Sequence, residues 1–236
     1  MKINILLALG LLLVACHNHE HSHNENGETH THSHHHSNDH SHHGGANKHM
    51  HQSSVEDLIE RFESPERDEY QQPEKVLDYL GDLQGKTVMD IGAGSGYFSV
   101  KLAARGANVI AADVDEEFQS YLKQRIEKDS IENITLRKLA YDSPGLDTAE
   151  VDMVLIVNTY HHIEDRVNYF KKLKAGLKEG GELVVVDFFK KETPVGPPVG
   201  HKIAKGQVVE ELSEAGFKSF DTNSDLLPYQ YIIKSK

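Results

Sequence analysis

Short apolar runs alternate with helical patterns along most of the chain after residue 85. Five runs predict strands, at residues 87–91, 108–112, 134–138, 153–157 and 182–188. Between most of them apolar residues recur at core-facing helical spacing, as at Phe118, Leu122 and Ile126. This alternation predicts an α/β fold with a doubly wound, mostly parallel sheet.

The two ends of this pattern complete the predicted fold. Helical periodicity begins at Ser53, a second short helix follows Pro73, and Gly81 ends it. We expect Gly106 to end one later helix and Gly180-Gly181 another. Two final strands, at 217–221 and 229–233, have no helical pattern between them, so they should pair antiparallel. The expectation is a Rossmann-like, seven-stranded sheet with a C-terminal antiparallel hairpin.

The first fifteen residues carry the pattern of a secretion signal, because Lys2 precedes a run of apolar residues that is short for a membrane-spanning helix. The run ends in Leu13-Val14-Ala15-Cys16, which resembles the lipobox of bacterial lipoproteins. The resemblance implies cleavage before Cys16, lipidation of that residue and attachment to a membrane of the cell envelope. A plain signal peptide or a short apolar anchor is the alternative, and translation from Met50 would instead give a cytoplasmic protein.

Residues 16–52 predict a hydrophilic, disordered tether, because fourteen histidines lie between His17 and His51 among few apolar residues. Neutral imidazole binds Zn, Cu or Ni, but nothing fixes a coordination number, so any binding should be weak and non-specific. The candidate ligands are His17, His19, His21, His23, His30, His32, His34, His35 and His36. A simple spacer is the alternative reading.

Composition limits the possible partners. The net charge of −12 provides no basic surface for nucleic acid, and one cysteine permits no intrachain disulfide. We therefore expect no nucleic-acid partner, a membrane contact through the lipid on Cys16, and a monomer built on one globular domain at residues 53–236.

A glycine-rich loop follows the first predicted strand, in the run Asp90-Ile91-Gly92-Ala93-Gly94-Ser95-Gly96-Tyr97. Glycines at a strand-to-helix turn let backbone N–H groups approach a ligand closely. Dinucleotide-binding loops need a third glycine three residues after the second, and Tyr97 stands there. The spacing therefore disfavours an oxidoreductase.

Residues 90–96 resemble motif I of class I S-adenosylmethionine-dependent methyltransferases, and the likeness extends from about Arg67 to Lys236. The resemblance implies methyl transfer from S-adenosylmethionine to a small-molecule acceptor. It also implies a set of cofactor-binding residues, namely Asp90, Gly92, Ala93, Gly94, Gly96, Asp113, Val114, Asp142, Asn158 and Tyr70.

Within this set, the resemblance implies that Asp113 binds the ribose hydroxyls and Asp142 the adenine amino group. Asp90 can serve the loop indirectly by holding its backbone. Local chemistry allows simpler roles. Asp113 can be a helix N-cap, Asp142 a turn residue, and Tyr70 part of a polar turn beside a helix.

Three histidines are candidates for acid–base chemistry at the acceptor. His161 and His162 follow the fourth predicted strand, where parallel sheets bind ligands, and His201 lies on a proline-rich loop after the fifth. His161 or His162 can remove a proton from an acceptor, or simply pack or cap the next helix, and His201 can reach the same mouth of the site. A metal-binding lipoprotein of the envelope, whose Rossmann-like domain binds a ligand without catalysis, is the alternative function.

Overall fold

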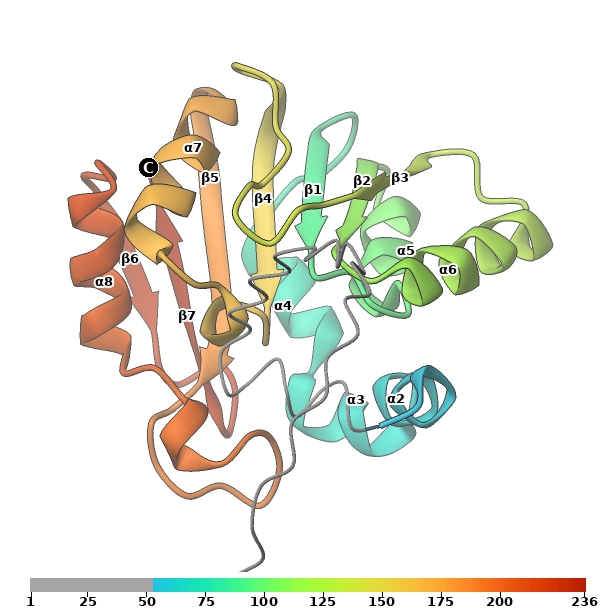
Figure 1. The fold of residues 1–236 in the computed structure, drawn as a ribbon, viewed down its shortest axis with the longest axis horizontal. Helices are drawn as coiled ribbons and strands as arrows, with labels where there is room; N and C mark the ends of the chain where they lie inside the picture. The colour runs from blue at the N-terminus through green and yellow to red at the C-terminus, as the bar shows by residue number, and fades with distance from the viewer. Residues whose placement is uncertain (1–52) are drawn as a thin grey trace, which may run out of the picture. The chain divides into compact units, whose positions relative to one another are not determined.

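The computed structural model describes residues 53–236, so the predictions for the signal peptide, Cys16 and the histidine-rich tether lie outside the described residues. A single seven-stranded sheet organises the domain (Figure 1). Its strand order is β3-β2-β1-β4-β5-β7-β6. The first five strands run parallel, and β7 pairs antiparallel with both β5 and β6. This confirms the predicted α/β, Rossmann-like fold with its antiparallel end.

The elements have the following bounds. The strands are β1 Thr87–Ile91, β2 Asn108–Asp113, β3 Ile134–Lys138, β4 Val151–Val157, β5 Leu177–Phe188, β6 Phe220–Asn223 and β7 Gln230–Ser235. The α-helices are α2 Val55–Phe62, α3 Pro65–Gln71, α4 Pro73–Leu80, α5 Tyr97–Ala104, α6 Glu116–Asp129, α7 Arg166–Gly176 and α8 Lys205–Glu214. Two short 3₁₀ turns, η1 Tyr160–His162 and η2 Val199–His201, complete the described part.

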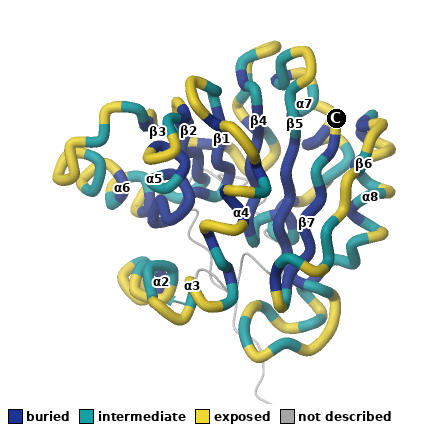
Figure 2. The backbone as a smooth tube through the Cα atoms, turned by 180° about the vertical axis from the view of Figure 1, so that it is seen from behind, coloured by how far each residue is buried: buried dark blue, intermediate teal, exposed yellow. Residues whose placement is uncertain are grey.

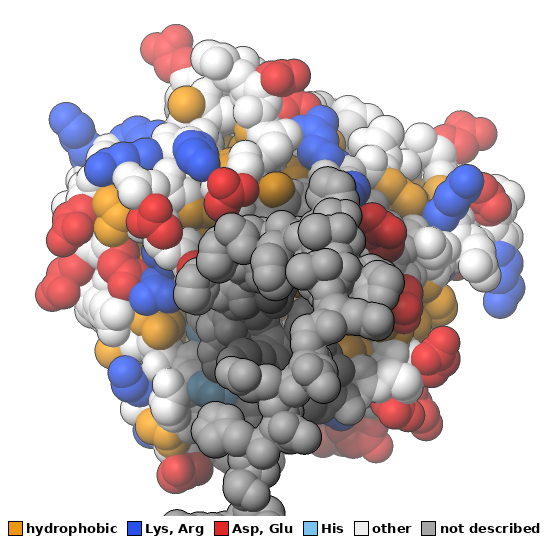
Figure 3. Space-filling model, in the orientation of Figure 1, with side chains coloured by type: hydrophobic (Ala, Val, Ile, Leu, Met, Phe, Trp, Pro, Cys, Tyr) orange, Lys and Arg blue, Asp and Glu red, His pale blue; other side chains and the backbone are white. Residues whose placement is uncertain are grey.

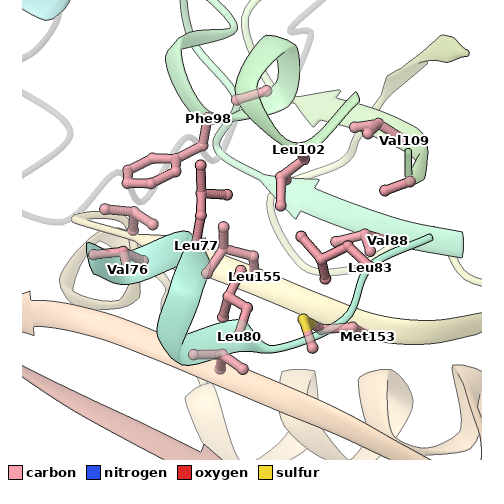
Figure 4. Close-up of a cluster of buried hydrophobic side chains, with 14 of the residues drawn as sticks. Val76, Leu77, Leu80, Leu83, Val88, Phe98, Leu102, Val109, Met153 and Leu155 are labelled. Carbon is pink, nitrogen blue, oxygen red and sulfur yellow. The ribbon is translucent and has the colours of Figure 1, made fainter. Parts of the chain in front are cut away.

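Apolar side chains from both faces of the sheet form two cores. On one face, α4 and α5 pack on β1, β2 and β4 (Figure 4), where Leu77, Leu102 and Leu155 are fully or almost fully buried. On the other face, α7 and α8 contribute Phe170 and Leu212. The central strands are therefore buried on both sides, whereas α2 and α3 carry mostly exposed and half-buried residues (Figure 2).

The structure departs from the predicted pattern near Gly180. We expected Gly180-Gly181 to end a helix, but α7 ends at Gly176 and β5 begins at Leu177. Leu177 pairs with Val151, and the register then shifts between Val151 and Met153. Gly180 has a φ of +75°. A Cβ added to Gly181 would lie 2.9 Å from Lys178 O, so no larger residue fits there without a shift of the backbone. Both glycines therefore lie within β5, where its pairing with β4 is irregular, and the pairing of Leu177 could not be read from the sequence.

Two helices, α3 and α8, were not predicted. The sequence of α3 is almost entirely polar, so it shows no apolar stripe, and its start depends on the Ser64 cap and on Pro65 at the first helical position. Among the described residues, no helix is long and apolar enough to span a bilayer.

Candidate active site

A cavity of about 870 Å³ lies where the carboxyl ends of β1, β2 and β4 meet the N-terminal helices. Its wall includes part of the glycine loop, the residues that follow β2 and β4, one side of α3, and the loop after β5. The principal lining residues are Arg67, Tyr70, Gly92, Ala93, Gly94, Asp113, Val114, Tyr141, Asn158, His161, His162, Phe188, Pro197, Pro198 and His201. Most of the residues expected at the site are thus brought together.

The glycine loop is held by its own backbone. Gly92 and Ala93 both donate N–H bonds to Ala112 O, at 2.9 and 3.1 Å, which fixes the turn against the end of β2. Gly94 lines the cavity, and a Cβ added there would come no closer than 3.5 Å to Phe62. Because no side chain intervenes at Gly94, a ligand can approach the loop backbone closely.

Gly96 has a different role from the one expected. It does not line the cavity, but has a φ of +83° and immediately precedes α5. An added Cβ would lie 2.3 Å from Leu122 Cδ1 in the buried face of α6. Gly96 therefore permits close packing of the loop on α6 rather than ligand contact.

Asp113 joins the loop to the cavity wall. Its Oδ2 accepts the Gly94 N–H at 2.8 Å and its Oδ1 accepts the Asp115 N–H at 2.9 Å. Burial raises the pKa of Asp113, and these backbone donors oppose the increase. The N-cap of α6 is Asp115, so the alternative role for Asp113 as a cap is wrong.

Asp90 lies beneath the loop and does not line the cavity. Its carboxylate is almost fully buried and accepts a 2.7 Å bond from Ser99 Oγ in α5. Burial raises the pKa of Asp90 to about 6. It contacts the helix after the loop through this bond, which agrees with an indirect, supporting role.

Asp142 is exposed and does not line the cavity, although Leu139, Ala140 and Tyr141 just before it do. Its backbone oxygen accepts a bond from Lys172 Nζ at 2.8 Å. Val114, by contrast, lies on the wall as expected.

The exit of β4 brings a histidine against a buried carboxylate. His161 Nδ1 lies 2.9 and 3.1 Å from the two Asp187 oxygens, and both side chains are buried, at 3% and 0% exposure. Asp187 Oδ1 also accepts the Phe188 N–H at 2.7 Å. Asp187 carries no signal in the sequence, because an aspartate near the end of a buried strand is recognised only when its partner is known.

His162 and His201 line the same cavity as His161. The His161 and His162 rings lie 4.3 Å apart between centroids. Burial, with a smaller contribution from His161, lowers the pKa of His162 to about 3, so this ring is neutral at physiological pH. The next helix, α7, begins at Arg166 after Asp165, so neither His161 nor His162 is its N-cap.

The loop that carries His201 is fixed by Lys202, which the sequence analysis did not single out. Its side chain is buried, and its Nζ donates to Lys191 O at 2.8 Å and to Thr193 Oγ1 at 2.5 Å. Both ends of the proline-rich loop are therefore tied together beside the cavity.

The α3 helix forms another part of the cavity wall. Tyr70 packs near Phe188, with ring centroids 6.0 Å apart, and the Arg67 guanidinium carbon lies 3.9 Å from the centre of the Tyr97 ring. Arg67 Nη1 donates to Phe62 O at 3.1 Å, but its buried Nε has no hydrogen-bond partner among the described residues. An anionic ligand group could use that donor.

These features define a class of protein. A parallel sheet with a glycine loop after β1, a buried carboxylate after β2 and a large cavity at the switch point binds a nucleoside-containing cofactor. Gly94, Asp113 and the unpartnered Arg67 Nε provide a close backbone approach, hydroxyl acceptors and an anion donor, which fit S-adenosylmethionine. No group of three or more potential ligands in residues 53–236 can hold a metal ion.

Comparisons with known proteins agree with this class. Residues 89–185 match the family model described as a methyltransferase domain. A solved S-adenosylmethionine-dependent methyltransferase from Aquifex aeolicus is 26% identical, with a TM-score of 0.72 over 78% of this chain and 98% of that one. A phosphoethanolamine N-methyltransferase from Haemonchus contortus, solved with S-adenosylmethionine, is 19% identical and shares the fold, with a TM-score of 0.57 over 65% of this chain and 38% of that one.

Two curated relatives differ in their acceptors. A ubiquinone biosynthesis O-methyltransferase from Acinetobacter baylyi is 24% identical over 62% of this chain and 69% of its own length. A tRNA U34 carboxymethyltransferase from Pseudoalteromonas translucida is 31% identical over 48% of this chain and only 35% of its own length. The chain is an S-adenosylmethionine-dependent methyltransferase, and these matches do not fix its acceptor.

Proposed function

We propose that this enzyme transfers a methyl group to a hydroxyl oxygen of a small, neutral, planar acceptor, with His161 as the general base. The observation that carries the proposal is the contact between His161 Nδ1 and the buried Asp187 carboxylate. Further support comes from the relative in Acinetobacter baylyi, which is named as an O-methyltransferase.

The chain's own residues suit the cofactor. Gly92, Ala93 and Gly94 line the cavity with the loop backbone, the free lone pairs of Asp113 would accept bonds from the ribose hydroxyls, and Val114 would pack beside the adenine. Arg67 and Tyr70 of α3 and Asn158 after β4 line the same cavity and would border the cofactor. The cofactor supplies the activated methyl group. Because Asp142 is exposed, we propose no adenine contact for its side chain.

A base is needed only for an acceptor that must lose a proton before or during transfer. In the tautomer that donates Nδ1–H to Asp187, Nε2 is the ring nitrogen that can accept the hydroxyl proton. Asp187 holds the ring orientation and stabilises the imidazolium that forms. An acceptor that already has a free lone pair, such as a neutral amine, does not require this pair.

The acceptor end of the cavity indicates a neutral, planar molecule. Beside His161 the cavity lining includes aromatic, proline and imidazole groups, namely Phe188, Pro197, Pro198, His162 and His201. His162 is neutral because its pKa is lowered by burial. The net charge of −12, and the mixture of acidic and basic side chains on the coloured surface in Figure 3, disfavour a nucleic-acid acceptor.

The test incubates the full chain with methyl-labelled S-adenosylmethionine and a panel of catechols, each paired with its aromatic-amine analogue. Label should pass to the hydroxyl compounds, and His161→Gln should lower that rate by about 10²-fold or more. The affinity for S-adenosylhomocysteine should stay within about threefold. Transfer to amines in preference to hydroxyls, or an unchanged rate in His161→Gln, would refute the role of His161.

For the N-terminal residues we propose that lipidated Cys16 anchors the enzyme in the cell envelope and that the histidine-rich tether at 16–52 binds Zn, Cu or Ni weakly. The sequence pattern of the leader and the fourteen histidines support these proposals. Cys16→Ser should release the protein from membranes, and unchanged fractionation would exclude the anchor. Calorimetry of the tether peptide with Zn²⁺ should show heat above the buffer blank, and no such heat would leave a spacer.

A further inference from the structure

Three side-chain amides form a closed hydrogen-bonded ring at the edge of the cavity. Gln71 Nε2 donates to Gln230 Oε1 at 3.0 Å, Gln230 Nε2 donates to Asn158 Oδ1 at 2.5 Å, and Asn158 Nδ2 donates to Gln71 Oε1 at 3.1 Å. Each amide in this amide ring gives one bond and receives one. Gln71 and Gln230 are fully buried, so their unpaired polar groups would be costly.

The amide ring joins three segments that are distant in the sequence. Gln71 is the last residue of α3, Asn158 follows β4, and Gln230 begins β7 opposite Phe188 of β5. Asn158 lines the cavity and has a left-handed backbone, with a φ of +56°. A non-glycine residue in that conformation needs support from its surroundings, and two of the ring's bonds supply it.

The α3 helix is short and polar, so it has little apolar burial to hold it. Near its middle, Asp68 accepts a bond from the Tyr97 hydroxyl of α5. At its end, Gln71 is the attachment to the sheet. Between these two points α3 presents Arg67 and Tyr70 to the cavity.

We propose that the amide ring is a positioning device for the cofactor site: it fixes α3 against the sheet so that Arg67 and Tyr70 cover the cofactor, and it holds Asn158 at the wall. The three ring residues act through the groups that they place. This inference rests on cofactor binding and is independent of the acceptor and of His161.

The chemistry of the amide ring gives a specific test. A carboxylate at position 71 can only accept. Asn158 already donates to this position, but the Gln230 amide must reverse to donate as well, which leaves the Gln230 and Asn158 side-chain oxygens facing each other. A protonated carboxyl has one O–H donor and one carbonyl acceptor, as the amide does, and can close the ring again. Gln71→Glu should therefore behave as the wild type when protonated and as a broken ring when ionised.

Several other titratable groups border this region and must be separated from that effect. They are Arg67 and Tyr70 on α3, His161 and His162 after β4, His201 on the proline-rich loop, and Asp187 and Tyr231 on β5 and β7. All of these are present in the wild type, so the ratio of variant to wild-type affinity at each pH isolates the new carboxyl.

The experiment measures the Kd of S-adenosylhomocysteine by calorimetry for the full-length wild type, Gln71→Glu, Gln71→Met and Gln84→Glu. A carboxyl buried at position 71 should have a raised pKa, so about pH 6 and about pH 9 sample its two forms. For Gln71→Glu we expect a Kd near wild type at the lower pH and at least about tenfold weaker binding at the higher pH. Gln71→Met should bind S-adenosylhomocysteine more weakly than the wild type at both pH values. Gln84→Glu, which changes an exposed residue, should bind it as the wild type does at both.

A Gln71→Glu to wild-type Kd ratio that is the same at both pH values would overturn the proposal, whether that ratio is near one or large. Gln230→Glu repeats the test from β7 and must give the same pH-dependent ratio, and it decides the matter if Gln71→Glu does not fold. If the wild type itself does not bind S-adenosylhomocysteine, the cofactor assignment is wrong. Failure of the cofactor assignment can therefore be distinguished from failure of the amide-ring proposal.

Discussion

The substitution Gly96→Ala tests the role that the structure gives to the third glycine of the loop. Gly96 has a φ of +83°, and an added Cβ would lie 2.3 Å from Leu122 Cδ1. Leu122 is fully buried among core side chains, so it cannot move aside without disturbing its neighbours.

Two costs add at this position. Placing alanine in the left-handed region costs about 1–2 kcal/mol. Forcing an extra methyl into a packed core costs about 1–3 kcal/mol more. We therefore expect Gly96→Ala to reduce the free energy of unfolding by about 2–5 kcal/mol.

Urea unfolding of the full chain measures this loss, with Gly85→Ala as the matched control. Gly85 also has a positive φ, of +74°, but an added Cβ would meet nothing within 4 Å. The control should lose only the conformational part, about 1–2 kcal/mol. If the two variants are destabilised equally, the collision with Leu122 does not exist and the account of Gly96 is wrong.

Three further predictions address the loop and the buried ionisable groups. Gly94→Ala should be destabilised less than Gly96→Ala, because its Cβ would make only a 3.5 Å contact with Phe62, yet it should weaken S-adenosylhomocysteine binding; an unchanged Kd would show that the ligand does not approach this backbone. The raised pKa of Asp90, from 3.8 to about 6, makes a stabilising contribution that is complete below pH 3.8 and is lost as the pH rises through about 6. Asp90→Asn, which keeps an acceptor for Ser99, should therefore be more stable than the wild type at pH 7.5, by up to about 3 kcal/mol in denaturant unfolding, and lower stability would refute the buried-charge argument. The pKa of His162 is lowered from 6.5 to about 3, so its contribution is present above pH 6.5 and lost as the pH falls through about 3; His162→Asn should flatten the acid side of the stability profile, and an unchanged profile would contradict its burial as neutral imidazole.

The sheet could be predicted because its strands are strong, local signals. The residues of β1 and β3 match the expected ranges, and the antiparallel end follows from the absence of a helix between β6 and β7. The helix α3 was missed because a polar segment held by Ser64, Gln71 and Asp68 has no periodic apolar face. Its stability comes from tertiary contacts that sequence periodicity does not reveal.

Some site residues could likewise be predicted from the local sequence. The glycine loop and Asp113 were found because each directly follows a predicted strand, although Gly96 and Asp90 do not line the cavity and instead support the loop. Asp187, Lys202 and Gln230 were not found, because the role of each depends on a hydrogen-bond partner that the folded chain brings to it. Asp142 was carried over from the family pattern, and in the structure its side chain is exposed and does not line the cavity.

The most direct test of the central claim is a calorimetric titration of the full chain with S-adenosylmethionine, S-adenosylhomocysteine and NAD, repeated with Asp113→Ala. We predict that the first two ligands bind, that NAD gives no heat above the blank, and that Asp113→Ala weakens binding by about tenfold or more, as expected for the loss of a buried hydrogen-bonding carboxylate. Binding of NAD without binding of either sulfur compound would contradict the assignment of this domain as a methyltransferase.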